Sequence, residues 1–208
     1  MTSKFLIIAF AGFASYFNSF GQVHLDTTAA MNQIAVFRQE LNDRFKDPEK
    51  TPLKESDLED FSELDFFPAN LSYRVVAEFI KANNSDTIKM KTTTGREPDY
   101  LKYAELVFYF DGVKFKLNVY QNIQLNKSEE YKNNLFLPFT DLTNGSESYG
   151  GGRYIDLKIP QGKTIVLDFN RYYNPLCAYN DNYSCPIPPP ENFMELEIKA
   201  GVKFFGKL

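Results

Sequence analysis

The first long patterned stretch of the chain alternates apolar and polar residues at helical spacing. In TTAAMNQIAVFRQELNDRFKDPEKTPL, the apolar residues recur three or four positions apart, at Ile34, Phe37 (or Arg38), Leu41 and Phe45. This spacing predicts an amphipathic α-helix over about residues 27–47, with Thr27 or Thr28 as its N-cap and Pro48 after its end. We expect the apolar stripe to pack on a sheet; attachment to a membrane surface is the second interpretation.

From residue 71 onward the apolar positions recur every second residue, which is typical of strands. The clearest case is AELVFYF-DG-VKFKLNVYQ, because Asp-Gly is favoured in two-residue hairpin turns. With Phe110 opposite Val113, one face of this hairpin is entirely apolar: Leu106, Phe108, Phe110, Val113, Phe115, Leu117 and Val119. The other face carries Tyr109, Lys114, Lys116 and Asn118. The hairpin therefore predicts a sheet with one face on the core and one in water.

A second hairpin is predicted in RYIDLKI-PQGK-TIVLDFN. With Ile159 opposite Thr164, the apolar face of this pair ends in Arg153, Asp168 and Asn170. Charged groups are costly to bury unless they are paired, and a diagonal neighbour is within reach of a long side chain. We therefore expect an ion pair between Arg153 and Asp168.

These elements together predict the fold class. A short polar helix is expected around residues 57–63, followed by strands from about 71 to 205, with no repeat and no linker. We predict a single β-rich domain over residues 22–208. It is mainly β (α+β), an antiparallel β-sandwich or partly open β-barrel with an N-terminal amphipathic helix.

The beginning of the chain predicts a targeting segment. Lys4 precedes the apolar run FLIIAFAGFASYF, and small residues lead up to Gly21, which is the order found in secretory signal peptides. We expect residues 1–21 to be a signal peptide and the remainder to be periplasmic or secreted. The run is shorter than the roughly 20 residues of a membrane span, so an uncleaved anchor is the alternative. No later segment is expected to cross a membrane.

Composition limits the kinds of binding and catalysis that we expect. The net formal charge of −4 gives no basic footprint for nucleic acid. His24 is the only histidine, so catalysis or metal binding through a positioned imidazole is not expected. We expect no metal and no cofactor. For an exported chain, the simplest interpretation of CAYNDNYSC is a disulfide between Cys177 and Cys185; thiol redox catalysis and a zinc site are weaker interpretations.

Two loop segments near Arg153 are the strongest candidates for a site. NGSESYGGGRYIDL places three glycines before Arg153, which permits positive φ or a close approach by another group. RYYNPLCAYNDNYSCPIPPPEN is proline-rich and is expected to form a rigid loop. We expect the two segments to meet over the guanidinium, either as a bulge beside a buried ion pair or as the rim of a pocket. The candidate cluster for a small polar or anionic ligand is Glu147, Tyr149, Arg153, Asp168, Asn170, Glu191 and Asn192.

The same stretches resemble a known family. FTDLTNGSESYGGGRYIDL and VLDFNRYYNPLCAYNDNYSCPIPPPENFMELEIKAG, with LDFFPANLSYRVVAEF before them, resemble the domain of unknown function 1684 family. The resemblance covers most of the chain beyond residue 21 and implies an uncharacterised bacterial protein, without a substrate. Tyr172 stands where Ala is usual, and Val202 stands where Glu is usual. If that Glu carries chemistry in relatives, this chain lacks it.

Three functions remain open. The first is a periplasmic or extracellular binding module for a small polar or anionic ligand. The second is a hydrolase or lyase that uses the carboxylates Glu147, Asp168 and Glu191 as acid and base, which requires two of them to face one cleft. Tyr149 would then donate a proton and Arg153 would stabilise negative charge. The third is a structural envelope protein in which the motif only holds the fold.

Overall fold

The computed structural model describes residues 27–83 and 86–206. The predicted signal peptide and His24 lie outside these residues. The main helix is α1 (Thr27–Lys46), and a short helix α2 (Glu55–Leu58) follows it. The strands are β1 (Arg74–Lys81), β2 (Thr87–Lys89), β3 (Asp99–Phe110), β4 (Val113–Asn122), β5 (Asn134–Asp141), β6 (Arg153–Lys158), β7 (Thr164–Asp168) and β8 (Phe193–Met194).

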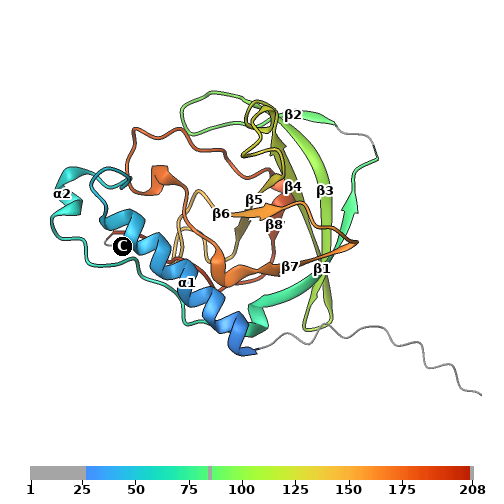
Figure 1. The fold of residues 1–208 in the computed structure, drawn as a ribbon, viewed down its shortest axis with the longest axis horizontal. Coiled ribbons are helices and arrows are strands. Elements are labelled where there is room, and N and C mark those ends of the chain that lie inside the picture. The colour runs from blue at the N-terminus through green and yellow to red at the C-terminus, as the bar shows by residue number, and fades with distance from the viewer. Residues whose placement is uncertain (1–26, 84–85, 207–208) are drawn as a thin grey trace, which may run out of the picture.

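The strands form one mostly antiparallel sheet that curls into a half-barrel (Figure 1). Six strands pair in the order β6-β5-β4-β3-β1-β7, while β2 pairs with β3 and β8 runs parallel to β5. The predicted mainly β fold class is confirmed.

The β3–β4 hairpin has the predicted register, with Phe110 opposite Val113. Asp111 and Gly112 both have positive φ, +47° and +81°, as a turn that matches the twist of the strands requires. Most of the predicted apolar face lies in or against the main core. Val113, beside the turn, is exposed instead, and Asn118, predicted to face water, is buried.

The predicted β6–β7 hairpin is wrong. β6 pairs with β5 along its length, and β7 pairs with β1, so the two strands lie at opposite ends of the strand order. An alternating strand can bury its apolar face beside any antiparallel neighbour, so alternation alone does not select the partner.

The chain that follows β7 covers the free edge of β6. After the 3₁₀ turn Phe169–Arg171, Tyr173 and Tyr154 exchange two backbone hydrogen bonds, of 2.9 and 3.0 Å. The segment therefore satisfies backbone groups on the outer edge of β6, which protects that edge from pairing with another chain.

Helix α1 spans nearly the predicted range, and Ile34 and Phe45 are buried while Phe37 and Leu41 are partly buried. The Arg38 side chain donates to the Phe67 carbonyl at 2.7 Å, which ties the helix to the segment before β1. The polar helix predicted at 57–63 is the shorter, earlier α2. The strands predicted up to residue 205 reduce to β8 and an isolated bridge between Phe66 and Val202.

Candidate functional site

Arg153 begins β6 and is completely buried. Its Nη2 donates to Asp141 Oδ2 and to the Ile198 carbonyl, both at 2.7 Å, and its Nη1 donates to the Ala200 carbonyl. The prediction that Arg153 pairs with Asp168 is wrong, since the carboxylate that binds Arg153 is that of Asp141, at the end of β5. These contacts fasten the C-terminal segment to the sheet and leave the guanidinium no access to a ligand from solvent.

Asp168 and Asn170 form a separate buried cluster. Asp168 Oδ2 accepts from Arg74 Nη1 at 2.7 Å, across the β1–β7 pair. The Asn170 amide bonds both backbone groups of Asn70, at 2.9 Å each. This cluster anchors the segment that enters β1.

The glycine-rich and proline-rich segments meet at Gly152 and Pro188, whereas the partners of the Arg153 guanidinium come from β5 and the C-terminal segment. Gly152 has φ +89°, and a Cβ there would lie 2.7 Å from the Phe139 carbonyl oxygen and 2.7 Å from Pro188 Cγ. Positive φ and this close approach both demand glycine. Gly152 thus serves packing beside buried Arg153.

Glu147 and Tyr149 do not reach Arg153. The Glu147 carboxylate is exposed and pairs with Lys199 at 3.0 Å. The Tyr149 hydroxyl lies 3.7 Å from Cys177 Sγ, and burial, together with the bond to Cys177, raises the pKa of Tyr149 to about 12. The backbone N–H of Cys177 donates to Cys185 Sγ at 3.1 Å, and both thiols are free.

Glu191 and Asn192 attach the proline-rich segment to β4 and β5. The buried Asn192 side chain accepts from the Asn118 N–H at 2.9 Å and donates to the Asn118 and Pro138 carbonyls, at 2.9 and 2.7 Å. Glu191 Oε1 accepts from the Tyr120 hydroxyl at 3.2 Å. Tyr120, which Glu191 contacts, lines the cavity described next, whereas Glu147 lines a different cavity together with Asp65 and Lys203.

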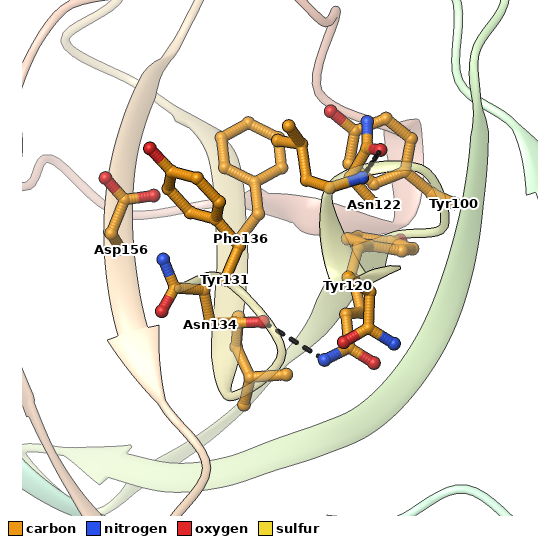
Figure 2. A pocket seen from close by; sticks show the side chains of 11 residues that line it. Tyr100, Tyr120, Asn122, Tyr131, Asn134, Phe136 and Asp156 are labelled. Carbon is orange, nitrogen blue, oxygen red and sulfur yellow. Dashed lines mark hydrogen bonds between the residues drawn. The ribbon is translucent and has the colours of Figure 1, made fainter. Parts of the chain in front are cut away.

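A cavity of about 260 Å³ lies beside Tyr120, where β4 and β5 diverge after the single pair Tyr120–Phe136 (Figure 2). Phe136 in turn pairs with Asp156 on β6. Since directly opposed residues share a face, these three side chains lie opposite the main core, which takes Val119, Leu135 and Ile155 from the same strands. The cavity is lined by Tyr100, Tyr120, Gln121, Asn122, Leu125, Asn126, Tyr131, Asn134, Leu135, Phe136 and Asp156.

Asp156 is the charged side chain of this lining. Its side chain is exposed to solvent, and the Tyr173 hydroxyl donates to its Oδ2 at 2.7 Å. Loss of hydration among the surrounding side chains raises the pKa of the Asp156 carboxyl, against the opposing effects of the Tyr173 bond and of Lys158 and Arg44. The carboxyl therefore keeps its proton at a higher pH than a free aspartate does.

Our sequence interpretation missed this cavity. Its strand residues Tyr120, Phe136 and Asp156 occupy the side of each strand opposite the core-facing residues. Aromatic residues at such positions were the available indication, because a strand face in water normally carries polar side chains. Among the described residues, there is no group of three or more His, Cys, Asp or Glu side chains that could hold a metal ion. None of the described helices is long and apolar enough to cross a membrane.

A sequence profile for the family described as "Protein of unknown function (DUF1684)" matches residues 59–203. The chain belongs to the DUF1684 family. Within solved structures, this DUF1684 chain is similar to an uncharacterized protein of Haloarcula marismortui solved by solution NMR. The two share 33% identity with a TM-score of 0.68, over 86% of this chain and 96% of that one. No curated protein matches this DUF1684 chain.

The two departures from the DUF1684 pattern are packing positions in this chain. Tyr172 is completely buried between Phe139 and Phe169, with ring centroids 4.3 and 4.9 Å away. Val202 is buried in an apolar cluster with Phe45 and Leu64. A carboxylate at residue 202 would have to be buried in that cluster, so the valine suits this chain.

Proposed function

We propose that this protein is a binding module for a small polar ligand and that the cavity beside Tyr120 is its site. The observation that carries the proposal is the lining, which combines four aromatic rings with amide groups and one carboxylate. Ligand sites are concave and mostly apolar, with a few polar groups that orient the ligand. The Arg153 cluster supports a structural role instead, because internal partners occupy the guanidinium.

The carboxylate hydrolase is the weaker alternative. Asp168 is bound to Arg74, Glu147 to Lys199 and Glu191 to the Tyr120 hydroxyl. An acid–base pair must face one cleft, about 5–10 Å apart, and these three carboxylates serve separate contacts. A purely structural envelope role is the second alternative, supported by the way the motif residues fasten loops to the sheet.

The test uses two tyrosines that are both exposed. Tyr131, 37% exposed, lines the cavity, whereas Tyr109, 58% exposed, lies on β3 and is absent from the lining. Two-dimensional NMR titration with small neutral polyols, alkylammonium salts and carboxylates is expected to yield at least one compound that shifts the resonances of lining residues. Tyr131→Ala should weaken that binding, and Tyr109→Ala should leave it unchanged. If no class of compound shifts the lining resonances, the proposal fails.

We also propose that the protein is exported and that Cys177 and Cys185 become oxidised to a disulfide. The support is the signal-like sequence of residues 1–21 and the proximity of Cys185 Sγ to the backbone of Cys177. Expression of the full chain in a bacterium, followed by intact mass of the periplasmic fraction, is expected to show a start near Gln22 and a mass lower by two hydrogens. An intact N-terminus in the cytoplasmic fraction would contradict export.

A further inference from the structure

The one charged side chain in the lining of the cavity is acidic. Of its eleven lining residues, Asp156 alone carries a carboxylate, and none is Lys, Arg or His. The nearest basic groups lie outside the lining: Lys158 Nζ donates to the lining residue Asn134, and the charges of Lys158 and Arg44 act to lower the pKa of Asp156 without forming an ion pair with it among the described residues. A ligand with a negative charge would meet no cation in the lining.

The rest of the lining supplies aromatic rings. Figure 2 shows Asp156 and Tyr131 on one side of the cavity, Tyr100 and Tyr120 on the other, and Phe136 between them. The Tyr100 and Phe136 rings pack with centroids 5.9 Å apart. Burial raises the pKa of both Tyr100 and Tyr120, so these phenols stay neutral at physiological pH. Tyr120 is fully buried and Tyr100 nearly so, so the rings that a ligand would contact first are those of Tyr131 and Phe136. Neutral aromatic faces attract cations, and ring faces beside a carboxylate can hold a quaternary or alkylated ammonium group.

We propose that the cavity binds a small organic cation with an alkylated ammonium group, held between the aromatic rings and Asp156. This inference rests on the proposed function and adds the chemical class of the ligand. The volume of about 260 Å³ limits the ligand to a small molecule, since sites for drug-sized ligands occupy roughly 300–1,000 Å³. The amide groups of Asn122 and Asn126 would contact the polar remainder of such a ligand.

The experiment compares choline with its uncharged carbon isostere, 3,3-dimethylbutan-1-ol, at matched ionic strength. The two probes have the same shape, so a difference in affinity reports the charge. By NMR titration of the full-length protein, choline is expected to bind at least about tenfold more tightly than the isostere, because only choline gains the interaction of its charge with a solvated carboxylate and with ring faces. Equal affinities would overturn the inference.

Asp156→Asn removes the charge and keeps an oxygen that can accept from Tyr173. We expect it to weaken choline binding about tenfold and to leave binding of the isostere unchanged. Asp181→Asn is the matched control, because Asp181 is 89% exposed at its side chain and pairs with Lys54 away from the cavity. The affinity of the wild type for choline should also fall as the pH is lowered through the pKa of Asp156. An affinity for choline that is unchanged in Asp156→Asn would overturn the inference.

A neutral sugar provides the decisive comparison. Binding of glucose, but not of choline, at the lining resonances would overturn the cationic ligand and leave the binding function standing. Loss of all binding classes, in wild type and variants alike, would overturn both.

Discussion

At Gly152, the side chain of any other residue would collide with two parts of the molecule at once. The φ of +89° is unfavourable for residues with a Cβ, and that atom would lie 2.7 Å from the Phe139 carbonyl and from Pro188. Gly152→Ala is therefore expected to destabilise the fold by about 1–3 kcal/mol. Gly162→Ala is the control, because a Cβ at Gly162 meets nothing within 4 Å. Urea denaturation measures both, and equal stabilities would contradict the proposed packing.

Arg153, the next residue, tests whether the motif has a structural role. Lysine keeps the charge but lacks the planar fork that reaches Asp141 and two carbonyls together. We expect Arg153→Lys to lower the free energy of unfolding by about 2–4 kcal/mol. Arg171→Lys, at an exposed position, should stay within about 0.5 kcal/mol of wild type.

Ligand binding separates the two roles of Arg153. At a temperature where Arg153→Lys is folded, its affinity for any cavity ligand should match that of wild type, because Arg153 does not line the cavity. A stable variant that has lost ligand binding would instead place the site at Arg153.

Sequence reasoning at this scale identified a buried arginine and missed its partner. Arg153 is buried and paired, as the cost of burying a charge requires. Its carboxylate, however, comes from Asp141, at the end of β5. The choice of Asp168 depended on the assumed β6–β7 register, so the error in strand pairing became an error in the ion pair.

Among the elements, the proline-rich segment is held to the sheet through one side chain. The Asn192 amide satisfies both backbone groups of Asn118 and the Pro138 carbonyl. Asn192→Asp replaces two donated hydrogen bonds by contacts between a carboxylate and carbonyl oxygens. We therefore expect it to lower the free energy of unfolding by about 3 kcal/mol or more. Hydrogen exchange should show reduced protection of the Asn118 amide. The same change at Asn182, which is exposed, should have little effect on stability or exchange, and an equal response at both positions would argue against this role of Asn192.

The two predicted hairpins show what local sequence determines. Asp111-Gly112 provides both positive-φ residues of a two-residue turn, and the β3–β4 register follows from that turn. PQGK offers no such tight turn, and β6 and β7 instead pair with strands far from each other in the sheet order. Register was predictable where the turn itself imposes it, and pairing was not where it depends on the closure of the whole sheet.

At the scale of the whole molecule, the cavity is formed by side chains from several separate segments of the chain. β3 to β6 supply its strand residues, the loop after β4 supplies Leu125, Asn126 and Tyr131, and Glu191 holds the Tyr120 hydroxyl from outside. Each contributing segment is unremarkable in sequence. The cavity could not be predicted from the sequence, because it depends on the strand order, on the loop after β4 and on the segment that contains Glu191. The mainly β class, by contrast, followed from alternation alone.

The thiols of Cys177 and Cys185 have unequal pKa values. The bond with Cys185 lowers the pKa of Cys177 to about 6, whereas the pKa of buried Cys185 is raised. Because the thiolate is the reactive form, Cys177 in the reduced protein should react with iodoacetamide at pH 7 with a pH midpoint near 6. Cys177→Ser is the control. A midpoint near the usual value of about 8.5 would contradict this environment.

A thiolate that is already formed at neutral pH also attacks or forms disulfides readily once an oxidant is present. The bridge would close the short loop from Cys177 to Cys185, and loop-closure entropy predicts a gain of about 2–3 kcal/mol over the reduced form. Urea unfolding with and without a reductant measures this difference, and a Cys177→Ser, Cys185→Ser double variant should show none. If the free energy of unfolding of the wild type is the same with and without the reductant, the expectation that a bridge between Cys177 and Cys185 stabilises the fold is contradicted.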